Sequence, residues 1–381
     1  MRRRPWNPVQ ITLFLGLIMT ASSVSSAHNT PDGARTASKA DPSAPRVIAD
    51  LHVDPLLWNR DLLASEPGSQ VDLPGMLEGG VNVAVFGVVS AGFPVINGWR
   101  AFGWWRGWPR EARRSAWASA QYQIERLHDA VARSEGAMVM ATTASEIESA
   151  LRAGRVAVML GVEGAFPLEG RVERVAQLHE AGAVYMGLAH LRSSPSAGCS
   201  YPLSFNRGLT ELGRSVLAAM EEVGMFVDLA HSSKRAFWET LEATSGPVLC
   251  SHTGVAGVEK SWRNLDDAQL KAIADRGGVI GIMVATNFLG GKTIARWVEH
   301  VDHAVAVAGI DHVALGTDLD GFVPLPEGIE TIADLPRLTE ALEEAGYTSE
   351  QISKIMGGNF LSMMRRFRPG PTGSSEDKVS P

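Results

Sequence analysis

The chain alternates short, near-continuous apolar runs with longer amphipathic segments. The runs consist mostly of Val, Ile, Leu, Met and Ala, which is typical of parallel strands buried on both faces. Eight runs are expected strands: residues 47–52, 81–89, 156–162, 183–190, 225–231, 248–252, 278–285 and 313–318. Helical periodicity predicts helices at residues 113–134, 171–181, 209–223, 234–244, 266–275, 293–308, 335–345 and 350–367. Several of these segments end at a glycine, a common helix stop.

Strands that alternate with helices in this way predict an α/β fold. We expect a single-domain (β/α)8 barrel of the TIM type over residues 45–368. The alternative is a doubly wound open sheet, which would need a phosphate-binding glycine pattern after its first strand if it bound a nucleotide. The residues that follow the first strand are His52-Val-Asp-Pro-Leu-Leu-Trp58 instead, so the barrel is favoured.

The ends of the chain have a different composition. Residues 1–27 contain three arginines, a short apolar stretch at 11–21 and small residues near 27, a pattern that predicts a signal peptide and export. The stretch is too short to span a bilayer as a helix, so we expect no stable membrane span after cleavage. An uncleaved N-terminal anchor is the alternative. Residues 28–44 are expected to form a flexible leader and residues 369–381 a disordered tail.

The charge of the remaining chain excludes some partners. Residues 1–27 hold three of the 35 basic side chains and none of the 42 acidic ones, which leaves 32 basic against 42 acidic, a formal charge of −10. This excess argues against nucleic acid and against anionic membrane surfaces. The sequence contains two cysteines, Cys199 and Cys250. We interpret Cys250 as a buried thiol in a core strand, although export would also permit a Cys199–Cys250 disulfide.

Polar groups stand at the ends of six of the eight expected strands. They are His52 with Asp54, Glu163, His190, His231, His252 and Asp318. The carboxyl ends of barrel strands meet on one face, where barrel enzymes build their active sites. Imidazole and carboxylate are ligands of zinc-like metals. The pattern therefore predicts a metal site, although any one of these residues alone would more often be structural.

The number of candidate ligands indicates two metals. One tetrahedral zinc with a water needs three protein ligands, whereas five are present: His52, Asp54, Glu163, His231 and His252. Two Zn2+ ions per chain that share the Glu163 carboxylate would use all five. Such a pair can activate a bridging water for the hydrolysis of amides, esters or phosphates.

The chain resembles the membrane (renal) dipeptidases, which are binuclear zinc metallopeptidases on a (β/α)8 barrel. Seven pieces match in family order across residues ~47–360: Asp50-Leu-His-Val-Asp54, Gly161-Val-Glu-Gly164, His190, Asp228-Leu-Ala-His231, Ser251-His252, Arg263-Asn-Leu-Asp-Asp267 and Gly316-Thr-Asp-Leu-Asp-Gly321. Each piece is weak alone, but the ordered set is specific.

The resemblance implies a role for each matching residue. His52 and Asp54 would bind the first zinc, Glu163 would bridge, and His231 and His252 would bind the second. Asp318 would move the proton between water and the leaving amine, with a metal ligand or a capping acid as its alternatives. His190 would contact the substrate carbonyl or oxyanion, and Arg263 would bind the C-terminal carboxylate of a dipeptide. A guanidinium can bind a carboxylate through two hydrogen bonds.

Two departures concern the substrate end of the pocket. Ala165 replaces a glycine that many members carry after the bridging glutamate, and the segment 191–199 lacks the expected Asn-containing pattern. The expected activity is dipeptide hydrolysis. The alternatives are another amidohydrolase activity at the same metals, on a β-lactam, lactone or N-acyl amino acid, and a non-catalytic binding protein. A homodimer is a further alternative to a monomer.

Residues 97–109 follow the second expected strand and are rich in tryptophan. They contain Trp99, Trp104, Trp105 and Trp108 beside Arg100 and Arg106. The segment is expected to overhang the site. It would form an aromatic wall for substrate or an oligomer contact, or it would pack on the barrel's own helices.

Overall fold

The structure is a computed structural model that describes residues 47–90, 98–202 and 206–370. Within these ranges the strands are β1 (Ile48–Val53), β2 (Val81–Val89), β3 (Met138–Met140), β4 (Val156–Glu163), β5 (Ala183–Gly187), β6 (Phe226–Asp228), β7 (Val248–Thr253), β8 (Ile280–Ile282) and β9 (Val313–Leu315). The α-helices are α2 (Leu73–Glu78), α3 (Gly98–Trp105), α4 (Ala116–Arg133), α5 (Ala144–Arg152), α6 (Arg174–Glu180), α7 (Glu211–Glu222), α8 (Lys234–Ala243), α9 (Asp267–Asp275), α10 (Thr286–Leu289), α11 (Ile294–Ala308), α12 (Pro336–Glu344), α13 (Ser349–Ser353) and α14 (Asn359–Phe367).

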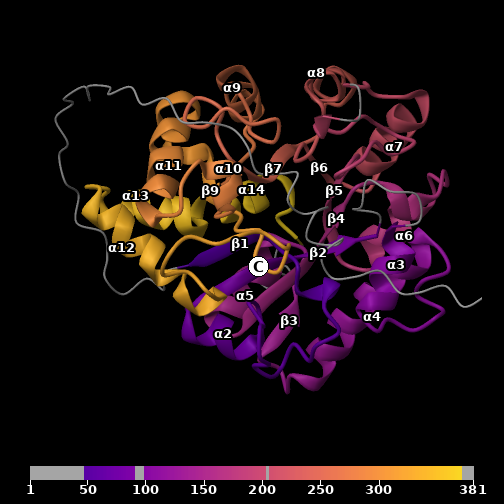
Figure 1. Cartoon of the computed structure of the whole chain (residues 1–381), viewed down its shortest axis with the longest axis horizontal. Helices are drawn as coiled ribbons and strands as arrows, with labels where there is room; N and C mark the ends of the chain where they lie inside the picture. Colours follow the sequence, from indigo (N-terminus) through magenta and orange to yellow (C-terminus); the bar gives the residue numbers. More distant parts are fainter. Residues whose placement is uncertain (1–46, 91–97, 203–205, 371–381) are drawn as a thin grey trace, which may run out of the picture. The chain divides into compact units, whose positions relative to one another are not determined.

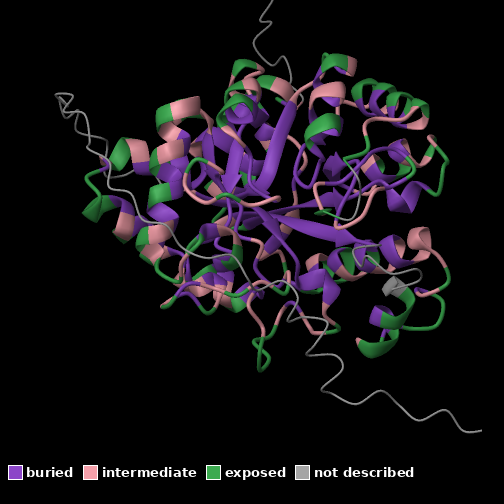
Figure 2. Cartoon of the chain, turned by 45° about the horizontal axis from the view of Figure 1, so that its top comes forward, coloured by how far each residue is buried: buried purple, intermediate pink, exposed green. Residues whose placement is uncertain are grey.

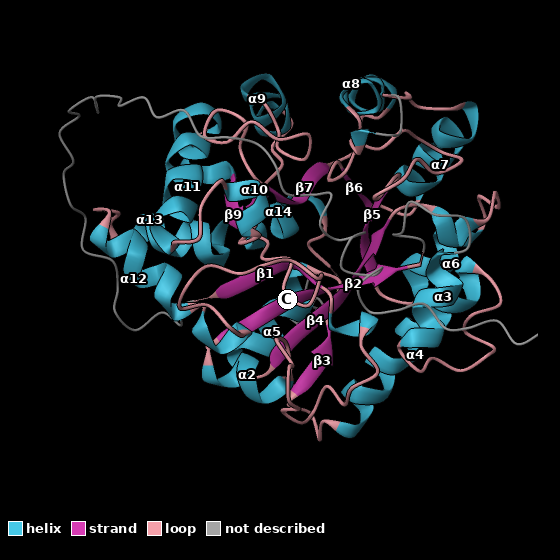
Figure 3. Ribbon diagram, viewed as in Figure 1, coloured by secondary structure: helices cyan, strands magenta, loops and turns pink. Residues whose placement is uncertain are grey.

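The strands form a closed parallel barrel. The hydrogen-bonded order is β2-β1-β9-β8-β7-β6-β5-β4, and β2 also pairs with β4 from Val83 opposite Ala157 to Val89 opposite Glu163. This last pairing closes a ring of eight strands inside the helices (Figure 1, Figure 3). The expected (β/α)8 barrel is confirmed, and the open-sheet alternative is excluded because no open edge separates β2 from β4.

The side chains of β4 point alternately to two separate parts of the hydrophobic core. Ala157 and Met159 belong to the hydrophobic cluster inside the barrel. Val158 and Leu160 belong to the larger cluster between strands and helices. Because side chains alternate along a strand, Glu163 lies on the same inward face as Ala157 and Met159. The buried strands and the exposed outer helix faces are separated in Figure 2.

The N-terminal end of the barrel is closed by apolar side chains of the last helix. Phe360, Leu361 and Met364 of α14 join the interior cluster with Ala49 and Ala314. This plug leaves the opposite, carboxyl end of the strands for the polar residues.

Several expected elements differ in extent. β5, β6, β8 and β9 are shorter than their apolar runs, because the last residues of those runs leave the hydrogen-bond ladder. β3 and α5 were not expected. The single helix expected at 350–367 is wrong, since a π-helical segment at Lys354–Gly358 separates α13 from α14. Gly357 has non-helical dihedral angles there and lies against β1, where an added Cβ would come 2.7 Å from the carbonyl oxygen of Val47.

The predicted signal peptide and leader, residues 1–27 and 28–44, lie outside the described residues. So does the predicted tail after residue 370. Among the described helices, none has both the length and the apolar character needed to cross a membrane.

Candidate metal centre

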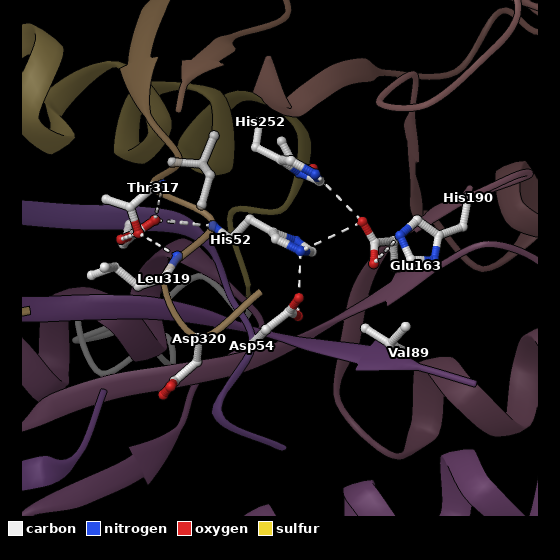
Figure 4. Close-up of polar contacts among 12 residues, drawn as sticks. His52, Asp54, Val89, Glu163, His190, His252, Thr317, Leu319 and Asp320 are labelled. Atoms are coloured by element: carbon white, nitrogen blue, oxygen red, sulfur yellow. Dashed lines mark hydrogen bonds and ion pairs between the residues drawn. The ribbon is translucent and has the colours of Figure 1, made fainter. Parts of the chain in front are cut away.

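Glu163, at the carboxyl end of β4, lies at the centre of a group of buried imidazoles (Figure 4). Its Oε1 atom lies 2.8 Å from Nε2 of His231, 3.4 Å from Nε2 of His252 and 3.7 Å from Nε2 of His52. Its other oxygen, Oε2, lies 3.1 Å from Nε2 of His190. One carboxylate therefore faces four histidines from four different strand ends.

His52 and Asp54 converge on one side of Glu163. Nε2 of His52 lies 3.4 Å from Oδ1 of Asp54, as expected from their spacing, although Asp54 stands one residue beyond β1. Room for both comes from Gly87 in β2, where a Cβ would come 2.1 Å from Oδ1 of Asp54 and 3.1 Å from Cε1 of His52. A glycine inside a strand often marks such a close approach.

His231 and His252 converge on the other side. His252 lies in β7, whereas His231 stands three residues beyond β6 with a left-handed backbone, at φ 60°. Their Nε2 atoms are 3.0 Å apart. The left-handed backbone of His231 is uncommon for a residue with a Cβ and is often found at functional sites.

The donor set fits two overlapping metal sites. His52, Asp54 and Glu163 form one group of potential ligands, and Glu163, His231 and His252 form another. Two ligands roughly 2.0–2.1 Å from a tetrahedral zinc lie about 3.3 Å apart, which matches the separations above. Nε2 of His52 and Oδ1 of Asp54 are buried without a hydrogen-bond partner, as expected of atoms that bind a cation.

Asp318 belongs to a third group, with His52 and His252. It stands three residues beyond β9 and has a left-handed backbone, at φ 66°. Its amide donates to the carbonyl oxygen of His52 at 3.0 Å, which continues the pairing of the β1 and β9 segments. The structure brings Asp318 to the candidate metal ligands, where a proton shuttle and a ligand are both compatible with its position.

Burial and mutual charge change the pKa values of the acids. Burial raises the pKa of Glu163 well above its ordinary value, and the carboxylates of Asp54 and Asp318 add to this effect. Burial and the charge of Asp54 raise the pKa of Asp318 to about 8. Without a cation, the centre therefore disfavours the full ionisation of its carboxyl groups.

The imidazoles divide into two classes. Burial opposes the charged form of His52, but the carboxylates of Asp54, Glu163 and Asp318 outweigh it and raise its pKa to about 10. Burial lowers the pKa of His231 and His252 well below their ordinary values, with Arg263 among the charges that add to the shift. The carboxylates that favour a positive charge on His52 would equally favour a metal cation, which would replace the proton because metal ligands must be deprotonated.

His190 completes the ring of histidines. It is buried, and burial together with the charges of His52 and Arg263 lowers its pKa to about 3. Its Nε2 atom faces Glu163, whereas Nδ1 is buried without a hydrogen-bond partner. The substrate contact expected of His190 stays a prediction.

Arg263 is held beside the histidines by their backbone. Its Nη2 donates to the carbonyl oxygen of His252 at 2.8 Å, and its side chain is buried. Nη1 has no hydrogen-bond partner. A cavity of about 370 Å³ is lined by both Arg263 and His231, together with Tyr201 and Trp262. The free donor and the cavity fit the expected binding of a carboxylate.

The tryptophan-rich segment has two different faces, as far as it is described. Phe102 and Trp108 are buried with Leu57 and Val89, so part of the segment packs on the barrel. Trp104 is 71% exposed and Trp105 is 61% exposed. The segment therefore combines packing on the barrel with an exposed aromatic face.

Asp50, Asp228 and Ser251 lie behind the metal-facing groups; they belong to the matching sequence pieces but were given no role there, and Tyr185, which also lies there, was missed. Oδ1 of Asp228 accepts from the amides of Ala230 and Ser251 at 3.0 and 2.9 Å, and its Oδ2 accepts from Ser251 Oγ at 2.6 Å. A carboxylate inside an apolar run was the available signal for Asp50 and Asp228, because a buried charge needs several donors. Tyr185 has no comparable signal. Cys199 and Cys250 are both buried and not disulfide-bonded.

Comparison with known sequences gives similarity along most of the chain. The sequence description of the membrane dipeptidases (peptidase family M19) matches residues 43–369. An uncharacterized protein from the pqqA 5′ region of Klebsiella pneumoniae is 30% identical over 256 residues, 64% of this chain and 94% of that protein. An uncharacterized dipeptidase of Schizosaccharomyces pombe is 31% identical over 222 residues, 56% of this chain. That alignment covers 53% of the yeast protein, about half its length.

Solved structures share the fold. A metallopeptidase of family M19, dipeptidase AC, superposes with a TM-score of 0.72 at 24% identity, over 86% of this chain and all of the other. A metallopeptidase from Rhodobacter sphaeroides, solved with a phosphinate mimic of the dipeptide L-Ala-D-Ala, superposes with a TM-score of 0.73 at 24% identity. That superposition covers 84% of this chain and 99% of the other.

Proposed function

The chain belongs to the membrane dipeptidase family, peptidase family M19, and from this premise we propose that it is an exported binuclear zinc dipeptidase. Membership of the family makes it a metal-dependent hydrolase. The observation that carries the finer proposal is the convergence of four imidazole Nε2 atoms on Glu163, three of them on its Oε1. A buried carboxylate shared in this way is suited to bridge two cations.

The proposed ligands form two sets, and Glu163 belongs to both. His52 and Asp54 would hold one zinc, His231 and His252 the other, and Glu163 would contact both. The mixture of imidazole and carboxylate donors favours a zinc-like ion. Two zinc ions bound there would supply a bridging water of lowered pKa and polarise the scissile carbonyl group.

The chain's own residues would move the proton and orient the substrate. Asp318 would take a proton from the attacking water and return it to the nitrogen as the C–N bond breaks, so that the amine leaves as a neutral molecule and not as an amide anion. General acid–base catalysis needs a group within reach of the transferred proton. The position of Asp318 in one group with His52 and His252 supports this role.

His190 and Arg263 would fix the two ends of the peptide bond. The neutral His190 imidazole would contact the carbonyl oxygen, and Arg263 would bind the carboxylate of the C-terminal residue. The unpartnered Nη1 of Arg263 and the cavity it shares with His231 support a substrate with a free carboxylate close to the metals. A dipeptide places that carboxylate one residue past the scissile bond.

Export is proposed from the N-terminal sequence alone. The arginines and the short apolar stretch within residues 1–27 support a signal peptide. Edman sequencing of the secreted protein tests this, with a new N-terminus near residue 28 as the expected result. An N-terminus at Met1 in the secreted protein would contradict it.

The activity is tested with zinc-loaded protein and a panel of dipeptides, N-acyl amino acids, β-lactams and lactones. We expect dipeptides to be cleaved with the highest kcat/KM, and chelation of zinc to abolish the activity. Faster hydrolysis of another class would replace the dipeptidase proposal with a different amidohydrolase. Binding of dipeptides without turnover would favour a binding protein.

A further inference from the structure

His252 is held from behind by a serine and an aspartate. Oγ of Ser251 lies 2.6 Å from Oδ2 of Asp228 and 2.8 Å from Nδ1 of His252. The Asp228 carboxylate can only accept, and it also accepts from two backbone amides, so the single proton of Ser251 points to it. Oγ of Ser251 must then accept, and Nδ1 of His252 must donate. The Nε2 atom of His252 is left with a free lone pair.

His52 is held in an equivalent way by a tyrosine. Oη of Tyr185 lies 2.9 Å from the carbonyl oxygen of Leu51, to which it donates, and 2.8 Å from Nδ1 of His52. Because a carbonyl oxygen has no proton, the phenol proton serves that contact, and Nδ1 of His52 donates to the phenol oxygen.

The tyrosine reaches His52 across the inside of the barrel. Tyr185 comes from β5, which is not a neighbour of β1 in the sheet. The ring fits because β4 carries Gly161, where a Cβ would lie 2.1 Å from Cζ of Tyr185 and 2.3 Å from its Oη. The tyrosine itself is completely buried.

A second aspartate repeats the arrangement without an imidazole. Oδ1 of Asp50 accepts from the amides of His52 at 3.1 Å and Thr317 at 2.9 Å, and Oδ2 accepts from Oγ1 of Thr317 at 2.6 Å. Asp228 makes the same three contacts with Ala230 and Ser251. Only the Ser251 hydroxyl is hydrogen-bonded to a histidine ring, so the Asp50–Thr317 pair is an internal control for a purely structural role.

We propose that Tyr185 and the Ser251–Asp228 pair are positioning residues: Tyr185 sets the tautomer of His52, and the pair sets that of His252. Each of these hydrogen-bonded sets, called a relay below, serves one metal site. Each relay keeps the proton on Nδ1 and directs the Nε2 lone pair toward a cation. The inference rests on the proposed metal centre. Such outer contacts typically change metal affinity about 10–100-fold when they are removed.

The first test measures zinc dissociation constants of the purified protein by competition with a chromogenic chelator. Ser251→Ala and Tyr185→Phe are each expected to weaken one of two zinc equivalents by about 10–100-fold. Ser251→Thr keeps the hydroxyl and is expected to restore affinity. Thr317→Val removes the equivalent hydroxyl of the control pair and is expected to leave both dissociation constants within about 3-fold of wild type, well short of that loss.

Equal weakening by Ser251→Ala and Thr317→Val would overturn the relay in favour of a structural role. Unchanged zinc affinity in Ser251→Ala and Tyr185→Phe would overturn it as well. If wild-type protein binds no zinc, the proposed metal centre fails instead, so the two failures are distinguishable.

The second test needs no variant and therefore does not depend on folding of a mutant. Long-range proton–nitrogen NMR spectra of the imidazole rings in zinc-loaded wild-type protein report which nitrogen carries the proton. We expect His52 and His252 to be protonated at Nδ1 and metal-bound at Nε2. Protonation of either ring at Nε2 would overturn the proposal.

Discussion

The Nε2 atoms of His231 and His252 lie 3.0 Å apart in the interior of the carboxyl end of the barrel. Both rings are buried, and burial lowers the pKa of each well below its ordinary value. Burial therefore favours the neutral form of both imidazoles, and their Nε2 atoms also approach Oε1 of Glu163. Two neutral donors and a carboxylate at these separations are a ligand set for one cation.

Metal content is the first prediction. We expect the purified protein to bind close to two zinc-like ions per chain, because five candidate ligands surround two positions. Glu163→Gln should weaken both sites together, since Oε1 of Glu163 faces ligands of both groups. Elemental analysis after dialysis measures the effect, with the exposed Glu180→Gln as a control that should retain both metals. Loss of a single metal in Glu163→Gln would argue against a bridge.

Asp318 gives the second prediction. If it transfers the proton, Asp318→Asn should lower kcat roughly 10²–10⁴-fold while metal content stays at the wild-type value. Steady-state kinetics and elemental analysis on the same sample measure both. Because Asp318 lies within the ligand group of His52 and His252, a loss of metal in this variant would make Asp318 a ligand instead.

Arg263 gives the third prediction. A charge-assisted hydrogen bond contributes about 1.5–3 kcal/mol, so amidation of the dipeptide's C-terminus should cost the wild-type enzyme roughly 10–100-fold in kcat/KM. Arg263→Ala should lose about as much on the free acid, with little further loss on the amide.

The acid-to-amide ratio within each variant is the informative quantity. Arg263 also donates to the backbone of His252, and its removal can disturb the site equally for both substrates. Such a disturbance cancels in the ratio. A wild-type ratio near one would refute the carboxylate contact and favour a broader amidohydrolase.

His300 gives a prediction about pH and stability. Nδ1 of this buried histidine accepts from the amide of Val255 at 2.9 Å, and Nε2 lies 3.1 Å from the carbonyl oxygen of Leu289. Burial lowers its pKa from 6.5 to about 4. Between these values the unfolded chain binds more protons than the folded one, so stability falls as the pH decreases from about 6.5 to 4.

The variant His300→Gln separates this contribution from that of other groups. A glutamine can accept and donate at the same two positions but does not titrate in this range. Urea unfolding of metal-free protein should show a smaller loss of stability between pH 6.5 and 4, by on the order of 3 kcal/mol. An identical pH dependence in both proteins would exclude His300 as a source.

The positions of the candidate site residues were readable from the chain because parallel strands bring their carboxyl ends together. His52, Glu163 and His252 close apolar runs, and any barrel that buries those runs gathers them on one face. β2 begins and ends where its run does, since both its faces are buried. These features depend on local pattern and on the closure of the barrel, so the sequence determined them.

The ends of other runs needed the tertiary structure. His231 and Asp318 stand just beyond short strands, and each has a left-handed backbone conformation. Apolar patterning does not encode such a conformation. The break at Gly357 arises because the last helical segment lies against the carbonyl oxygen of Val47. Nothing within the segment itself indicates where β1 approaches.

The protonation of the imidazoles shows most clearly what the sequence determined and what only the tertiary structure decided. The sequence determined that histidines and acids of the right kind meet at one end of a barrel. Which nitrogen faces the metal depends on Tyr185, 133 residues from His52, and on Asp228, 23 residues from Ser251. Tyr185 meets His52 only in the closed barrel, because β5 and β1 are not neighbours in the sheet, whereas Asp228 meets Ser251 through the pairing of β6 with β7.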